Sequence, residues 1–161
     1  FGDGLQVAAV TLIGQSLGQG NKALAKKYGN ICQSIGLAIS IGLSIIYLLF
    51  GRWFFGIYFP NEPYIVDLGV SIIKYMIIIV LFQVSQVVFG GSLRGAGDVR
   101  FTTVTSMISV AIIRPSISYI AAYVLQLGIT GIWIGVLADQ AVRLVMSGLR
   151  FRSGRWMNKE I

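Results

Sequence analysis

The sequence predicts an all-α integral membrane protein, a polytopic bundle of about five transmembrane helices. Hydrophobic residues make up 55% of the 161 residues and charged residues only 12%, against roughly 25% charged in soluble domains. The mean hydropathy is +0.78. The charges are clustered, and the uncharged run 28–51 is long enough to cross a bilayer, for which about 20 residues suffice. A soluble core of this size could not bury so much apolar surface.

Five apolar segments follow one another, and we expect them to form a single transmembrane domain over residues 1–161. Glycines and Asn21 separate the first two segments and suit a helix end followed by a helix cap. An aromatic-rich stretch, predicted to be a loop at the membrane interface, covers 52–63 and ends in two prolines. A glycine-rich turn follows the third segment, and the uncharged turn 127–131 separates the last two. The predicted spans are 5–17, 28–51, 64–91, 101–125 and 132–149.

The distribution of positive charge predicts how the helices are oriented. In a soluble protein a net charge of +7 would suggest nucleic acid, but here the basic residues lie between spans, and we expect no nucleic-acid partner. The opposite loops carry only Arg52. Because positive loops stay cytoplasmic, we predict an integral membrane protein with a cytoplasmic C-terminus. We expect the membrane to be the plasma membrane. The basic turns and tail hold Lys22, Lys26, Lys27, Arg94, Arg100, Arg150, Arg152, Arg155 and Lys159.

Several classes of function are disfavoured by what the sequence lacks. Cys32 is the single cysteine and there is no histidine, so we predict no disulfide, no zinc site and no metal site. The sequence shows no nucleophile–base pair, so an enzyme is not expected. Residue 1 is Phe and a helical pattern begins almost at once, which suggests that the chain is part of something longer.

Polar residues inside the spans are the candidates for a substrate cavity. Gln83 and Gln86 lie one turn apart near the middle of the third span, where an amide must face protein or water. Cavity lining and hydrogen bonding between helices are equally good explanations. In the second span Gln33 and Tyr47 belong to one face with small residues. We favour a packing surface there, with a cavity wall as the alternative, and a similar face in the fourth span includes Ser109.

Charged residues within spans are functional candidates by default. Lys74 is close enough to an outer end to snorkel to the interface. Arg114 and Asp139 lie at matched depth on neighbouring helices, and we predict that they form an ion pair. The competing arrangement pairs Asp139 with Arg143, four residues later on the same helix.

Two glycine-rich segments resemble turns of the multidrug and toxic compound extrusion (MATE) transporters. Residues 14–21 resemble the turn after the eighth helix of that family, and residues 91–98 resemble the turn after its tenth helix. The segments 114–119, 128–133 and 150–156 match the end of that fold in order. The cytoplasmic turns would include Gly14, Gly18, Arg94, Gly95 and Gly97.

The resemblance implies a transporter of two six-helix bundles, of which this chain would be helices eight to twelve in the C-terminal lobe. It implies antiport, in which Na⁺ or H⁺ entry drives the export of organic, often cationic compounds, without a cofactor. Expected partners are membrane lipid, small organic substrates and the missing N-terminal bundle. Some family members use a carboxylate where this chain has Gln83. Because an amide carries neither proton nor charge, we expect the coupling ion to bind mainly outside this chain.

Two alternatives remain. A lipid or oligosaccharide flippase of the same broader fold would need several inward-facing cations, for which Lys74 and Arg114 are candidates. A non-transporting membrane scaffold or truncated product is the other, because a single bundle has no second wall to rock against.

Overall fold

The structure is a computed structural model that describes residues 1–60 and 62–158. In this part of the chain the regular structure is helical throughout, with no strand. The α-helices are α1 (Gly2–Gly18), α2 (Lys22–Tyr58), α3 (Pro63–Gly95), α4 (Val99–Ile108), α5 (Arg114–Tyr119) and α6 (Ile129–Arg152). A 3₁₀ turn, Arg155–Asn158, follows α6.

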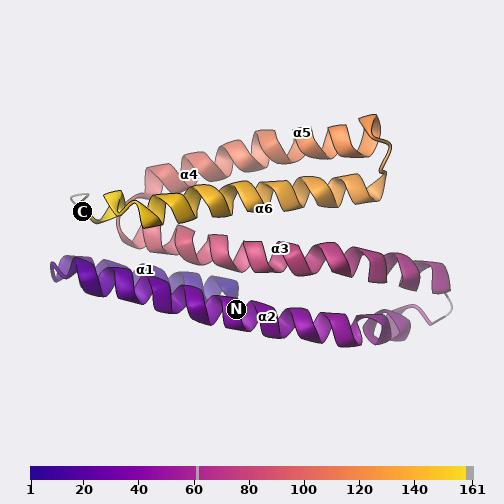
Figure 1. Cartoon of the computed structure of the whole chain (residues 1–161), viewed down its shortest axis with the longest axis horizontal. Helices are drawn as coiled ribbons and strands as arrows, with labels where there is room; N and C mark the ends of the chain where they lie inside the picture. The colour runs from indigo at the N-terminus through magenta and orange to yellow at the C-terminus, as the bar shows by residue number, and fades with distance from the viewer. Residues whose placement is uncertain (61, 159–161) are drawn as a thin grey trace.

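The helices form one layer with a single helix behind it. Helices α2, α3, α6 and the α4–α5 segment lie side by side in that order, and α1 packs behind α2 and α3 (Figure 1). Four helical stretches are long and apolar enough to cross a membrane: Lys22–Tyr58, Pro63–Gly95, Val99–Val124 and Ile129–Arg152. The prediction of an all-α membrane helix bundle is therefore confirmed.

The turns after α1, α3 and α6 meet at one end of the bundle, on the left in Figure 1. We call it the basic end, because eight of the nine cations that the sequence assigned to one side lie on the helix ends and turns there. The ninth, Lys159, lies outside the described residues. The opposite end holds the α2–α3 and α5–α6 turns, with Arg52 close to the first of these.

The prediction of a loop over 52–63 is wrong for residues 52–58, because α2 continues to Tyr58. Apolar aromatic side chains do not break a helix, and no proline occurs before Pro60. Helical packing also holds this extension in place: Gly51 lies against Ile73, and Phe55 lies against Gly69. The helix ends only where Phe59 precedes a proline.

The fourth span is one continuous helix that changes its winding twice. A π-helical segment, Ser109–Ile113, precedes α5, and a second, Ile120–Val124, follows it. Pro115 lies at the start of α5; it has no N–H to donate and its ring crowds the preceding turn. The wider turn before it is closed by a hydrogen bond from the Arg114 N–H to the Ser109 carbonyl.

The predicted turn glycines divide into two groups. Gly14 lies inside α1, so its assignment to a turn is wrong, while Gly18 is the last residue of α1 and Gly95 the last residue of α3. The left-handed turn positions are Gly20 and Gly97, with φ of 74° and 78°, which glycine adopts without steric cost. Arg94 lies in the last turn of α3.

Glycines in the last turns of α3 let the backbone of α1 come close to the backbone of α3. A Cβ atom on Gly95 would lie 2.5 Å from the Val10 carbonyl oxygen, and one on Gly91 would lie 2.8 Å from that of Gln6. On the α1 side of the same contact, a Cβ atom on Gly14 would lie 3.3 Å from the Gly95 carbonyl oxygen. Close backbone approach through small residues is how membrane helices gain packing energy without a hydrophobic driving force between them.

We predict that Gly95→Ala destabilises the protein by about 1–3 kcal/mol, the range for overpacking a close contact. Gly90→Ala is the matched control, because a Cβ there meets nothing within 4 Å and alanine is the better helix former. Thermal unfolding of both variants in detergent measures the difference. Equal stability of the two variants would contradict the close α1–α3 contact.

Candidate functional site

One face of α3 carries an exposed amide. Gln83 is exposed although it lies in the middle of a long apolar helix, and Gln86 is half-buried. The neighbouring face of α3 is covered by α1, whose first residues reach Val84 through Gly2. Because α1 begins beside Val84, α1 does not cover the part of α3 that precedes Val84.

An apolar, aromatic-lined groove of about 360 Å³ lies between α2 and α3 at the end opposite the basic end. Met76 is part of its wall. Seven residues, about two helical turns, separate Met76 from Gln83, so both lie on the same face of α3. The groove and Gln83 therefore belong to one continuous surface, which we call the Gln83 face. The groove is lined by Tyr47, Gly51, Phe54, Phe55, Tyr58, Phe59, Ile73 and Met76.

The fold therefore places the four polar cavity candidates, Gln33, Tyr47, Gln83 and Gln86, on different surfaces of the bundle. Tyr47 belongs to the Gln83 face, whereas Gln33 lies in a different groove with Ser85 and Phe89. Ser85 is two residues from Gln83 and therefore points to the other side of α3. Whether any of these residues contacts substrate stays a prediction. The sequence pattern placed Gln33 and Tyr47 on one face of α2, but a 37-residue helix passes more than one neighbour along its length.

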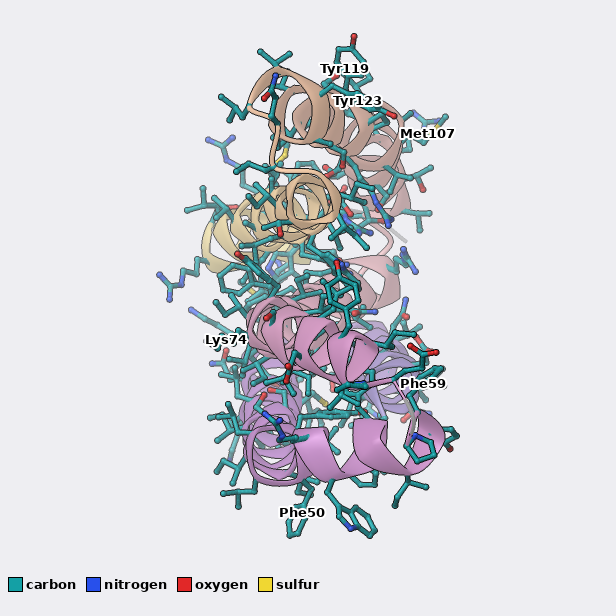
Figure 2. All side chains as sticks on the ribbon, turned by 90° about the vertical axis from the view of Figure 1, so that its right-hand side faces the viewer. Phe50, Phe59, Lys74, Met107, Tyr119 and Tyr123 are labelled. Atoms are coloured by element: carbon teal, nitrogen blue, oxygen red, sulfur yellow. The ribbon has the colours of Figure 1, made fainter. Side chains whose placement is uncertain are left out.

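Lys74 lies on the side of α3 away from the Gln83 face. Nine residues, about two and a half turns, separate Lys74 from Gln83, and Lys74 is exposed. Figure 2 shows Lys74 on the opposite side of the bundle from Phe59, with Phe50, Tyr119 and Tyr123 directed outward. Such outward aromatic and apolar side chains suit contact with lipid.

Asp139 on α6 is one of two fully buried acids among the described residues, and its side chain is 0% exposed. Its carboxylate accepts a hydrogen bond of 2.6 Å from Arg143 and another of 2.6 Å from the Ser109 hydroxyl. The predicted pair of Asp139 with Arg114 is wrong: the ion pair of Asp139 is with Arg143, and Arg114 is exposed. An arginine one turn away on the same helix reaches the acid without crossing the helix interface, and this decides between the two arrangements.

Glycines on α6 position this cluster. A Cβ on Gly131 would collide with the backbone of Ala121 and Ala122, and one on Gly135 would collide with Ser118. Helix α5 and the π-helical segment after it therefore pack closely against α6 at these two positions. One turn further along α6, the same face presents Asp139 to the π-helical segment that carries Ser109.

A second buried acid joins the turns at the basic end. Asp98, in the α3–α4 turn, is 0% exposed and accepts a hydrogen bond of 2.7 Å from Arg150 of α6. The Arg150 guanidinium also lies 5.2 Å from the centre of the Phe101 ring. Beside this pair, Trp156 stacks on Phe151. Asp98 ends the motif 91–98 that carried the resemblance, but no ion pair was predicted for it, because an acid in a glycine-rich turn looks solvated until the tertiary structure brings α6 over it.

These features define a polytopic membrane protein with an uncovered polar and aromatic face and buried charges that are paired. The MatE family matches residues 1–120. The chain therefore belongs to the MatE family of transporters, as the resemblance in its turns predicted. Its place as helices eight to twelve of such a transporter stays a prediction.

Comparison with individual proteins gives the same family. The chain is 29% identical over 160 residues to the "Probable multidrug resistance protein NorM" of Thermotoga maritima, covering 98% of this chain and 34% of that protein. It is 30% identical over 161 residues to the "Uncharacterized transporter YisQ" of Bacillus subtilis, covering 99% and 35%. The crystal structure of the eukaryotic MATE transporter AtDTX14 shares the fold, with a TM-score of 0.87 at 24% identity over 97% of this chain and 35% of that one. The chain thus spans about a third of the length of these relatives.

The Asp139 cluster yields a stability prediction. Arg143→Gln should destabilise the protein by about 3–5 kcal/mol, because it leaves a buried carboxylate without its cation. The double variant Asp139→Leu, Arg143→Met should recover most of this loss, because replacing a whole buried pair costs little. Unfolding in detergent measures both. Arg114→Gln is the control and should change stability little, and a large loss there with none at Arg143 would overturn the observed pairing.

Proposed function

We propose that this chain forms one helical lobe of a secondary active antiporter that exports organic, often cationic compounds in exchange for Na⁺ or H⁺. Family membership supports transport, and the name of the Thermotoga maritima relative supports multidrug efflux. The observation that carries the proposal is the Gln83 face. This face turns toward a second bundle, and the two bundles together enclose the substrate pathway.

The chemistry of the Gln83 face suits organic cations. Placing a primary amide in hydrocarbon without a hydrogen bond costs free energy. In this proposal Gln83 therefore faces water or another protein surface rather than lipid. Two turns away, aromatic rings line the 360 Å³ groove, and aromatic faces attract cations while their bodies bind apolar groups. A surface with one amide and several rings binds flat, positively charged organic molecules without needing a fixed ion pair.

The coupling ion binds mainly on the second bundle in this proposal. The described residues of α3 include one carboxylate, Asp67, which is exposed and forms an ion pair with Arg52. Asp139 is occupied by Arg143 and Ser109. Neither acid lies beside Gln83, and Na⁺ or H⁺ coupling requires an acid or an oxygen cage that the ion reaches from the pathway.

The arrangement of cations disfavours the flippase alternative. An anionic headgroup would need Lys or Arg on the pathway. Lys74 lies on the opposite side of α3 from Gln83. The other candidate, Arg114, lies on α5, which packs against α6 and is separated from α3 by that helix (Figure 1). Arg143 is neutralised by Asp139. The Gln83 face itself is aromatic and uncharged where it forms the groove.

Gln83→Leu in the complete natural protein should abolish or strongly reduce resistance of expressing cells to organic cations, while leaving expression unchanged. Leucine keeps the side-chain size and removes the amide. Lys74→Gln is the matched control on the far side of α3 and should leave resistance intact. Resistance that is unchanged in Gln83→Leu, with normal expression, would contradict the proposed pathway, and loss in Lys74→Gln alone would favour the flippase.

We also propose that the basic end is cytoplasmic. In a background where Cys32 is replaced by alanine, Lys27→Cys and Arg155→Cys should react with a membrane-impermeant thiol reagent only when the cytoplasmic side is opened. Arg52→Cys, on the opposite end, should react from outside intact cells. All three positions are exposed. The reverse pattern of labelling would overturn the orientation.

A further inference from the structure

On the side of α3 that faces away from Gln83, two grooves follow one another between α2 and α6. The first, at the basic end, has a volume of about 390 Å³ and a wall of both polar and aromatic side chains. Its lining includes Lys26, Asn30, Gln33 and Ser34 from α2, Phe89 from α3 and Arg152 from α6. Both cations are exposed, so two positive charges from different helices border one opening.

The second groove continues from the first toward the middle of the bundle. It has a volume of about 440 Å³ and a mainly apolar wall. Gln33, Phe89 and Arg152 line both grooves, so the two are continuous. Gly148 is part of its wall, with the Phe89 ring 3.7 Å from where a Cβ would stand. The remaining wall is formed by Leu37, Ser85, Leu144, Val145 and Leu149.

We propose that these grooves bind one anionic phospholipid with a glycerol headgroup, with its phosphate at Lys26 and Arg152 and an acyl chain along Gly148. The order of the grooves matches the order of a lipid's parts. Lys26 stands in the second turn of α2 at the basic end, and Leu37 stands about 16 Å further into the bundle at 1.5 Å per residue. Basic pockets between membrane helices at the level of the headgroups suit anionic lipids.

The two cations give the reason for an anionic headgroup. Lys26 and Arg152 attract the phosphate, and the glycerol headgroup of phosphatidylglycerol adds no charge of its own, so the lipid stays anionic. A choline headgroup brings a third positive charge beside Lys26 and Arg152.

The proposal rests on the proposed function in that the second bundle and the remaining helix of this lobe lie against other faces and leave this side to lipid. The site serves as a lipid anchor on the outside of the lobe and takes no part in the substrate pathway. Transport assays on Gln83 variants and lipid binding at these grooves can therefore fail independently.

The test uses the complete natural protein in nanodiscs that contain phosphatidylglycerol and phosphatidylcholine in equal amounts. Native mass spectrometry after release counts the lipids that remain bound. We expect a retained phosphatidylglycerol. Lys26→Gln and Arg152→Gln should each weaken its retention about fivefold, which corresponds to the contribution of one cation near the membrane surface. The matched controls Lys27→Gln and Arg155→Gln, outside both grooves, should retain it.

A second pair of variants tests the apolar groove. Gly148→Leu should fill the space beside Phe89 and reduce retention, while Gly42→Leu, where a Cβ meets nothing within 4 Å, should not. Equal retention of phosphatidylcholine and phosphatidylglycerol, or equal loss in Lys26→Gln and Lys27→Gln, would overturn the proposal. Displacement of the lipid by free glycerol phosphate at equal concentration would contradict the acyl-chain part of it.

Discussion

The structure depends on the close approach of helix backbones. In a lipid bilayer the hydrophobic effect does not drive helices together. Lipid tails solvate apolar side chains as well as other helices do, so association relies on packing and hydrogen bonds. Helix α3 is the centre of this packing and contacts α1, α2 and α6. Gly91 and Gly95 admit the backbone of α1, and Gly131 and Gly135 admit the α5 region to α6. Each of these approaches leaves no space for a side chain.

Once the helices are this close, their buried polar groups must find partners within the bundle. Asp139 and Asp98 are both fully buried, and each accepts a hydrogen bond from an arginine of α6. The first pair is within a helix and adds Ser109 from the π-helical segment, so it joins α6 to the fourth span. The second pair joins α6 to the turn between α3 and α4. The two pairs therefore hold one helix against its neighbours at two different depths.

The packing also gives α3 two different uncovered faces. On one face Gln83 and an aromatic groove remain open beside α1. On the other, Ser85 and Phe89 line the groove between α2 and α6, and Lys74 lies on the same side of the helix. A polar residue on the first face suits a water-filled pathway against a second bundle, whereas cations at the basic end of the second face suit lipid headgroups. This separation allows the proposed pathway and the proposed lipid site to share one helix.

The sequence alone determined the fold class and the family, because long apolar runs and glycine-rich turns are local signals. It also brought out Gln83 and Asp139, since polar groups in apolar helices are visible without a structure. It did not determine where α2 ends, because aromatic residues before Pro60 suit an interface loop and a helix equally well. Nor did it show that Gly14 and Gly95 serve helix packing, since a glycine's role depends on what stands opposite it.

Only the tertiary structure decided the partners. Counting residues from the turn between the fourth and fifth spans placed Arg114 and Asp139 at the same depth in the membrane. The rotation of each helix about its axis decided that Arg143, and not Arg114, forms the ion pair with Asp139. Because α2 passes more than one neighbour along its length, Gln33 and Tyr47 lie in different grooves. Asp98 and Arg150 are 52 residues apart, and no local pattern links them. Helical periodicity fixes which residues share a face, but packing between helices fixes what that face meets.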